Sequence, residues 1–229
     1  MRVFAIADLH LSLSDKNKAM DKFGRLWENH TERLYEAWQD TVAEGDLVLV
    51  AGDISWAMYF EDAEADLNFI HSLKGTKVLL RGNHDFWWPS YRKLCAALPP
   101  SIHAIQNNAL RFSDVSVCGS RGWTTPESSN YKASVDEKLF LRECIRLKLS
   151  ASCLSPDTQN LAMLHYPPFS EKGQPSGFVD ILEEAGVSEV VYGHLHGRVQ
   201  GDALTSERNG INYHLVAADY LSFVPKLII

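Results

Sequence analysis

Residues 77–85 read KVLLRGNHD, a short apolar stretch that ends in a group of polar side chains. Its first five residues have the length and apolar character of a strand buried on both faces, so Gly-Asn-His-Asp would stand at the strand's carboxyl end. Two earlier stretches repeat this form, since Val3–Ala7 precedes Asp8-Leu9-His10 and Leu47–Ala51 precedes Gly52-Asp53. The chain is therefore expected to place potential ligands at three successive strand ends.

Helical patterns separate these predicted strands. Thr31–Ala43 and Glu61–Lys74 carry apolar residues at spacings of three and four, which is typical of one buried helix face, and Gly75 is a natural stop for the second. Strands that alternate with helices predict parallel strands with helices packed outside them, an α/β fold.

The second half of the chain contains further elements of both kinds. A hairpin is predicted over Ala109–Gly119, a long loop over Gly119–Tyr131 and a helix over Lys132–Leu149. The apolar residues expected on one side of that helix are Val135, Leu139, Ile145 and Leu149. The remaining predicted elements are strands at Leu161–Leu164, Glu189–Tyr192, Ile211–Ala217 and Lys226–Ile229 and a helix at Phe178–Ala185. No repeat or linker divides the chain, so we expect one domain over residues 1–229.

The composition is that of a globular protein, with 229 residues of which 45% are hydrophobic and 22% charged. No apolar run approaches the ~18 residues of a membrane span, and residues 3–7 are too few for a signal peptide. The net charge is −7 without a block of lysine or arginine, so we expect neither duplex nucleic acid nor a membrane as partner. Four scattered cysteines without a CxxC pair indicate reduced thiols and a cytoplasmic location.

The groups at the strand ends have the composition of metal ligands. Asp8 and His10 are two residues apart, and an extended segment would point both side chains the same way, as it would for His194 and His196. Nitrogen and oxygen ligands without thiolate suit manganese, iron or zinc better than Mg²⁺ or Ca²⁺. One ion could be held by Asp8, His10 and His196 and another by Asn83, His165 and His194, with Asp53 bridging the two.

Each fragment alone also has an ordinary explanation. A lone Asp-x-His triplet or Gly-Asp pair most often belongs to a surface or a turn, and His165 by itself would more often be a hydrogen-bonded core residue. The conjunction favours a metal site, because all fragments occur in order and each stands at a strand end, where open α/β sheets bind ligands.

The ordered series DxH, GD, GNHD, a strand-end His and GHxH resembles the calcineurin-like metallophosphoesterase superfamily, over most of the chain from Asp8 to His196. The resemblance implies a four-layer α/β/β/α sandwich of two mixed sheets, with a dinuclear metal site at one edge. It assigns the seven ligand roles given above, and it makes His84 the motif histidine that does not bind metal. The implied activity is metal-dependent hydrolysis of phosphate esters.

Two adjacent ions could activate a water held between them and clamp a phosphate, so that the hydroxide attacks phosphorus. His84 would then bind the phosphoryl group or protonate the leaving oxygen. Two roles stay open for Asp85, which could orient the His84 ring or cap the helix that follows Pro89.

The motif details favour some substrates over others. Protein phosphatases of the superfamily resemble GDxVDRG and GNHE, whereas residues 52–57 read GDISWA and the later motif ends in Asp85. The GNHD form is more similar to the phosphodiesterase and nuclease branches, although Arg81 stands where many bacterial cyclic-nucleotide phosphodiesterases have proline. We therefore expect a small-molecule phosphate ester, with diesters slightly preferred over monoesters.

Two further residues are candidates for substrate binding. Trp56 could stack on a base or shield the site, or it could be core packing. Arg121 could clamp a phosphate, or it could be a surface arginine of the long loop. The alternatives to a diesterase are a phosphomonoesterase or protein phosphatase of the same fold, and a catalytically silent metal-binding scaffold.

Overall fold

The computed structural model describes the backbone of residues 1–229 and every side chain except those of Lys16 and Asp202. The chain divides into two compact units, which are Met1–Ala104 with Val216–Ile229 and, between them in sequence, Ile105–Leu215. Each unit is built around one mixed β-sheet, and the described chain has five α-helices. These elements confirm the predicted α/β fold of two mixed sheets with helices, whereas the single domain stays a prediction.

The first unit holds a five-stranded sheet whose central strands are parallel. Its strand order is β11 (Lys226–Leu227), β1 (Val3–Ile6), β2 (Leu47–Val50), β3 (Thr76–Leu80) and β4 (Ile102–Ile105). β1 pairs in parallel with β2 and β2 with β3, while β11 is antiparallel to β1. The carboxyl ends of β1, β2 and β3 therefore lie at one edge of the sheet, which is where the sequence motifs begin.

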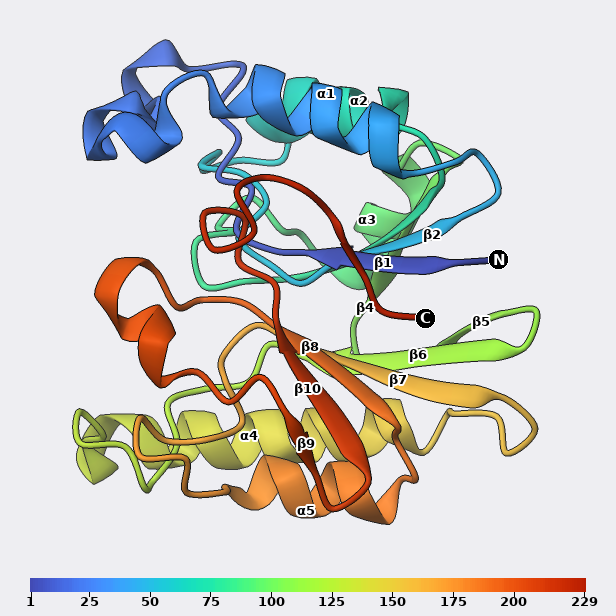
Figure 1. The fold of residues 1–229 in the computed structure, drawn as a ribbon, viewed down its shortest axis with the longest axis vertical. Helices are drawn as coiled ribbons and strands as arrows, with labels where there is room; N and C mark the ends of the chain where they lie inside the picture. Colours follow the sequence, from blue (N-terminus) through green and yellow to red (C-terminus); the bar gives the residue numbers. More distant parts are fainter. The chain divides into compact units, whose positions relative to one another are not determined.

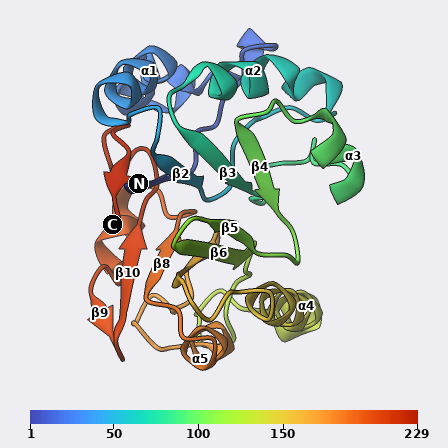
Figure 2. The ribbon, with the colours of Figure 1, turned by 90° about the vertical axis from the view of Figure 1, so that its right-hand side faces the viewer.

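Helices α1 (His30–Thr41) and α2 (Glu64–Ser72) lie side by side on one face of this sheet (Figure 1). Their predicted apolar positions are buried, including Leu34 and Trp38 of α1 and Leu67 and Ile70 of α2. The sequence did not predict β4 and marked α3 (Tyr91–Ala97) only as a helix after Pro89. The hydroxyl of Tyr91 donates to the carbonyl of Ala104, so α3 lies near β4 (Figure 2).

The second unit holds a six-stranded sheet. Its strand order is β5 (Leu110–Phe112), β6 (Val115–Ser120), β7 (Gln159–Leu164), β8 (Glu189–Tyr192), β10 (Ile211–Leu215) and β9 (Glu207–Arg208). The four inner strands are parallel, and the two edge strands are antiparallel to their neighbours. Helices α4 (Ala133–Ala151) and α5 (Gly177–Glu184) run beside one another along one face of this sheet (Figures 1 and 2).

Helix α4 forms where it was predicted, but the face expected to be buried is turned to solvent. Val135, Ile145 and Leu149 are each more than half exposed, and the buried residues are Phe140, Glu143, Leu147, Ser150 and Ala151. Hydropathy misplaced the face because a glutamate and a serine belong to the buried side, where hydrogen bonds satisfy them.

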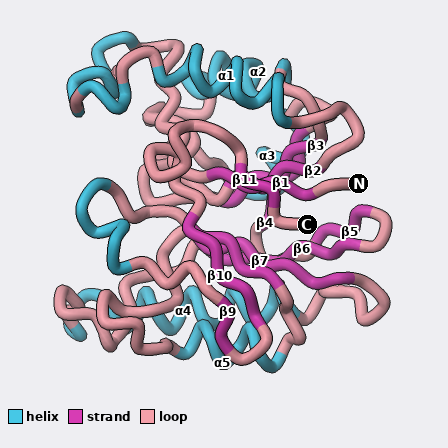
Figure 3. The backbone as a smooth tube through the Cα atoms, in the orientation of Figure 1, coloured by secondary structure: helices cyan, strands magenta, loops and turns pink.

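Long connections leave the strand ends of both sheets (Figure 3). They include the short 3-10 helices η1 (Lys16–Lys18), η2 (Met20–Phe23), η3 (Arg25–Trp27), η4 (Glu61–Ala63) and η5 (Gly197–Asp202). The long loop predicted after Gly119 also forms, between β6 and α4. Among the described helices, none combines the length and apolar character needed to span a bilayer.

Candidate metal centre

In the first unit, the loops that follow β1 and β2 run alongside each other. The amide of Asp8 donates to the carbonyl of Gly52 at 2.8 Å, and the amide of His10 donates to the carbonyl of Asp53 at 3.0 Å. Asp8, His10 and Asp53 all have positive φ, at 59°, 47° and 52°. The prediction that the segment from Asp8 to His10 is extended is therefore wrong. Its left-handed φ values bend the backbone toward the neighbouring loop. Non-glycine residues in this region are strained and cluster at functional sites.

Asp53 is the centre of this arrangement. Its side chain is buried, and its Oδ1 accepts a hydrogen bond from the amide of His84 at 2.8 Å. Its Oδ2 lies 3.9 Å from Nε2 of His10 and 4.0 Å from Nε2 of His84. Asp8 offers a ligand atom within 4.8 Å of ligand atoms of both His10 and Asp53. Two carboxylates and two imidazoles therefore converge at the carboxyl ends of adjacent strands.

Gly82 makes room for Asp53. A Cβ at this position would lie 2.1 Å from Oδ1 of Asp53 and 2.2 Å from its backbone nitrogen, so no other residue fits. The glycine of the GNHD motif thus lets the loop after β3 approach the loop after β2. Asn83, the next residue of the motif, is half buried.

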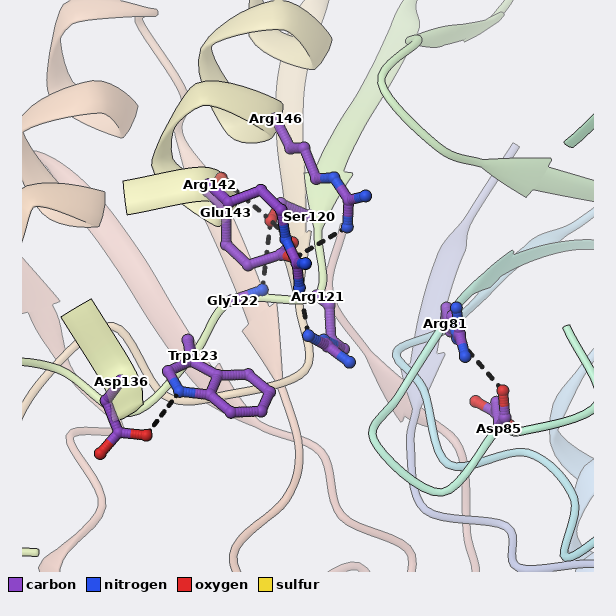
Figure 4. A network of polar contacts seen from close by, with 10 residues as sticks. All are labelled: Arg81, Asp85, Ser120, Arg121, Gly122, Trp123, Asp136, Arg142, Glu143 and Arg146. Atoms are coloured by element: carbon purple, nitrogen blue, oxygen red, sulfur yellow. Dashed lines mark hydrogen bonds and ion pairs between the residues drawn. The ribbon is translucent and has the colours of Figure 1, made fainter. Parts of the chain in front are cut away.

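Asp85 ties these loops together instead of orienting His84. Its Oδ1 accepts from the amides of Ile54 and Ser55 and from Nε1 of Trp87, and its Oδ2 accepts from the amide of Gly82. The His84 ring is not among these donors, and the cap residue of α3 is Ser90, so neither role expected for Asp85 is observed. Burial, with the nearby charge of Asp53, raises the pKa of Asp85 to about 6. The carbonyl of Asp85 also accepts from Arg81 at 3.1 Å (Figure 4).

Trp56 packs against the imidazoles of His10 and His84. Its ring stacks on that of His10 at 4.8 Å between centroids and lies 4.5 Å from that of His84. Its Nε1 points to the sulfur of Met20 at 3.2 Å, which fixes the plane of the indole. Trp56 therefore orients the two histidines, and its contact with substrate stays a prediction.

In the second unit, His165 and His194 lie close together after β7 and β8. Their ring centroids are 5.1 Å apart, and the amide of Gly193 donates to the carbonyl of His165 at 3.1 Å. His165 is fully buried, whereas His194 and His196 are half buried. His194 has a φ of 71°, so the segment from His194 to His196 is not extended either.

Tyr166 is a site residue that the sequence analysis missed. Its ring lies on that of His194 at 4.0 Å and meets that of His165 edge-on at 5.5 Å. It thereby fixes both imidazoles from one position. The signal was an aromatic residue directly after a candidate ligand, which periodicity does not detect.

Arg121 belongs to a polar network inside the second unit. Its guanidinium lies 3.6 Å from Oε1 of Glu143 and 4.6 Å from the ring centre of Trp123. Arg142 and Arg146 pair with the same carboxylate (Figure 4). The Arg121 side chain is only 17% exposed, so the alternative that Arg121 is a surface arginine of the loop is wrong. Its carbonyl accepts from the amides of His165 and Tyr166, which holds the loop after β7, and its contact with phosphate stays a prediction.

The donors of both units fit metal ions. With bonds of about 2.1 Å, two ligands of one ion lie about 3.4 Å apart at the tetrahedral angle and about 4.2 Å apart when opposite. The 3.9 Å between Asp53 and His10 falls within this range. Two imidazoles on one ion have centroids about 5 Å apart by the same geometry, as His165 and His194 do. Of the predicted ligands, the first unit carries Asp8, His10, Asp53 and Asn83, with the non-ligand His84 beside Asp53, and the second carries His165, His194 and His196.

Comparison with known proteins identifies the family. A family model of calcineurin-like phosphoesterases matches residues 1–198, whereas no curated protein matches the chain. The phosphopantetheinyl hydrolase of Mycobacterium tuberculosis has a similar fold, with a TM-score of 0.60 and 13% identity over 100% of this chain and 95% of that one. A protein of unknown function from Aquifex aeolicus, AQ665, gives 0.52 and 13% over 99% and 95%. The chain therefore belongs to the calcineurin-like phosphoesterase family and is a metal-dependent phosphoesterase.

Proposed function

We propose that the chain hydrolyses small-molecule phosphate esters at a site for two metal ions, with diesters slightly preferred. The observation that carries this proposal is the environment of Asp53. Its carboxylate is buried, its Oδ2 lies 3.9 Å from Nε2 of the proposed ligand His10, and a ligand atom of Asp8 lies within 4.8 Å of one of its oxygens. A carboxylate so placed can bind a different ion through each oxygen, which is the role given to the bridging ligand.

The ligands would divide as the sequence predicts. Asp8 and His10 with His196 would hold one ion, and Asn83 with His165 and His194 would hold the other. When bound, such ions supply Lewis acidity and an activated water. Manganese, iron and zinc are the proposed metals, because the donors are nitrogen and oxygen without thiolate.

His84 is proposed to bind the phosphoryl group or to protonate the leaving oxygen. Its side chain is 39% exposed while Asp53 beside it is buried, so the imidazole can reach a substrate without leaving the ligands. The amide of His84 bonds to Asp53, and Trp56 packs against its ring. The imidazole is therefore oriented to bind the phosphoryl group or to give a proton to the departing oxygen.

The proposed substrates include the ester class named for a similar structure, and the proposed location is the cytoplasm. The Mycobacterium tuberculosis protein is named a phosphopantetheinyl hydrolase, so phosphopantetheinyl esters belong among the compounds assayed. The cytoplasmic location predicted from the scattered cysteines is proposed on the same ground.

The first test is a substrate panel. The purified protein with Mn²⁺ is expected to hydrolyse bis-p-nitrophenyl phosphate faster than p-nitrophenyl phosphate, and a chelator should abolish both activities. Phosphoserine peptides, cyclic nucleotides and a phosphopantetheinyl ester complete the panel. Failure to turn over any of these compounds with added Mn²⁺ would favour the silent scaffold, and faster hydrolysis of the monoester would reverse the proposed preference.

Asp53→Asn tests the bridging role. An amide cannot give an anionic oxygen to each ion, so the variant is expected to lose metal stoichiometry as well as rate. Elemental analysis after gel filtration measures the metal content, and Asp40→Asn, an exposed substitution on α1, is the control. Two tightly held ions in Asp53→Asn would contradict the bridging role.

His84→Ala separates catalysis from metal binding. The variant is expected to keep both ions and to lose about 100-fold or more in turnover, which is the usual scale of general acid catalysis. Esters with poor leaving groups should lose more than p-nitrophenyl esters, because p-nitrophenolate leaves without a proton. Equal losses across the leaving-group series would remove His84 from proton transfer.

A further inference from the structure

The second unit contains a pocket of about 460 Å³, and most of the residues that line it are not proposed metal ligands. Three segments line it, namely the loop after β6 (residues 123–130), the loop after β7 (residues 166–171) and the segment after β8 with η5 (residues 192–204). The volume lies within the roughly 300–1,000 Å³ of small-molecule sites. His194 lines the pocket, so it opens beside a proposed metal ligand.

The wall of the pocket is apolar and aromatic. Trp123, Tyr166 and Phe169 contribute rings, and Leu195, Val199 and Leu204 contribute aliphatic groups. Such surfaces bind apolar or planar groups through burial and stacking. A phosphate or a free sugar would gain little from them.

Apart from His194, the polar side chains at the pocket are uncharged or negative. Thr125, Ser128, Asn130 and Ser170 offer hydroxyls and an amide, which suit hydroxyl or amide groups of a ligand. Among the described lining side chains there is no lysine or arginine. The carboxylate there is Glu171, and hydrogen bonds from Ser129 hold the pKa of Glu171 below its usual range. A second anionic group on the ligand would therefore meet a negative charge and no fixed cation.

The aromatic wall is rigid and continuous with His194. Nε1 of Trp123 donates to Asp136 at 3.0 Å, and the Trp123 ring lies 5.2 Å from that of Tyr166. The ring of Tyr166 lies in turn on His194 at 4.0 Å. The hydroxyl of Tyr192 donates to the carbonyl of Leu204 at 2.7 Å and joins two further lining residues. A ligand anchored at His194 would thus extend along Tyr166 toward Trp123.

We propose that this pocket binds the organic group of the phosphate ester and selects one that is uncharged and amphipathic. This inference rests on the proposed function, because it assigns the phosphate of the same ligand to the metal site. The substrate class is then an ester of a neutral alcohol that has an apolar or aromatic part and amide or hydroxyl groups. Phosphoproteins, polyphosphates and esters with a second acidic group are excluded from it.

Three esters with one leaving group test the selection. They are methyl p-nitrophenyl phosphate, 2-benzamidoethyl p-nitrophenyl phosphate and the 4-carboxybenzamido analogue of the second. The neutral benzamido ester is expected to have a KM about 10-fold or more below that of the methyl ester, as one well-filled apolar site gives. The carboxylated analogue should lose that advantage. An equal or lower KM for the carboxylated ester would overturn the proposal.

Val199→Trp should fill the pocket, and Val135→Trp on α4 is its matched control. Both valines are exposed, by 51% and 60%, but only Val199 lines the pocket. The Val199 variant is expected to raise KM for the benzamido ester about 10-fold while changing that for the methyl ester less than twofold. Ala203→Trp, which also narrows the pocket, repeats the test if Val199→Trp is unstable. Equal changes for both esters, or the same change in Val135→Trp, would show that the pocket does not select the group.

Direct binding keeps this inference separate from the proposed hydrolysis. N-(2-hydroxyethyl)benzamide, which has no phosphate, is titrated into the metal-free protein and followed by tryptophan fluorescence and calorimetry. Saturable binding that Val199→Trp abolishes and Val135→Trp retains would support the pocket even if no ester were hydrolysed. Hydrolysis of all three esters without binding of the alcohol and without a KM difference would support the proposed function and overturn the pocket.

Discussion

The sheet of the first unit buries charged side chains at both ends of its parallel strands, but the two ends satisfy them differently. At the amino ends, the carboxylate of Asp46 accepts from the side chain of Arg2 at 2.5 Å and from the amide of Ala43 at 2.9 Å. Burial alone would raise the pKa of Asp46, but these hydrogen bonds outweigh it and hold the pKa below its usual range. Beside it, Nζ of Lys77 donates to the carbonyls of Leu73 and Gly75. The chain itself supplies the partners at this end.

At the carboxyl ends, three buried carboxylates lie among histidines. They belong to Asp8, Asp53 and Asp85, and Oδ2 of Asp53 lies 3.9 Å from Nε2 of His10 and 4.0 Å from Nε2 of His84. Asp53 and Asp85 repel each other, which contributes to the raised pKa of Asp85. The difference teaches that the chain supplies hydrogen-bond partners for the buried charges at one end, whereas the group of carboxylates at the other end suits added cations.

Gly82→Ala should damage the carboxyl end most. The new Cβ would overlap the Asp53 carboxylate and its backbone nitrogen, and rotation of the Asp53 side chain cannot relieve the second contact. We expect metal affinity to fall by roughly 100-fold, the upper range for a disturbed ligand environment. Mn²⁺ titration calorimetry measures this loss.

The control for Gly82→Ala is Gly45→Ala in the loop before β2. A Cβ at Gly45 has no heavy atom within 4 Å, so metal affinity should stay unchanged. If Gly82→Ala bound Mn²⁺ as tightly as Gly45→Ala, the close approach of the two loops would not be required for the site.

Asp85→Asn should loosen the loops that carry the ligands. The carboxylate accepts from three donors at Oδ1 and one at Oδ2, and an amide in either orientation turns its NH₂ group toward at least one donor. We expect a loss of about 1–3 kcal/mol in the free energy of unfolding, the cost of an unsatisfied buried group. Urea denaturation measures it, with Asp40→Asn as the exposed control. An unchanged unfolding free energy would show that Asp85 does not hold the loops.

Much of this end was predictable from sequence, because a short apolar run followed by Asp, Gly-Asp or Gly-Asn-His-Asp marks a strand end. The local geometry was not predictable in the same way. Asp8 and His10 adopt left-handed φ values because hydrogen bonds to the loop of Gly52 and Asp53 draw the backbone there, and a pattern of spacing contains no such tertiary contact. Tyr166 and the pocket were missed for a related reason, since they belong to loops whose residues show no period.

The buried face of α4 shows a second limit. The helix has apolar residues on two sides, and hydropathy favours Ile145 and Leu149 over a side that contains Glu143. That glutamate is buried because Arg121, Arg142 and Arg146 pair with it. Ion pairs with Arg121 of the preceding loop and with two arginines of the helix itself therefore allow this face to be covered, and hydropathy does not register them.

Lys77 tests how well the chain satisfies a buried charge at the amino ends of the strands, and its expected effect on the unfolding free energy is the smallest of the three. Burial lowers the pKa of Lys77 to about 8, against the opposing influence of Glu44, while the unfolded chain keeps the usual value of 10.5. Between these values the unfolded state binds more protons than the folded one, so stability from this group rises with pH through that window. The slope is at most about 1.4 kcal/mol per pH unit.

Lys77→Met removes the titrating group and should flatten this rise. Urea unfolding of wild type and variant at pH 7.5, 8.5 and 9.5 gives the difference in unfolding free energy at each pH. The difference isolates Lys77 from the thiols of buried Cys118 and half-buried Cys144, whose raised pKa values lower stability at high pH in both proteins. A difference that stays constant with pH would mean that Lys77 remains fully charged in the folded state. The hydrogen bonds to the carbonyls of Leu73 and Gly75 would then compensate fully for the burial of the ammonium group.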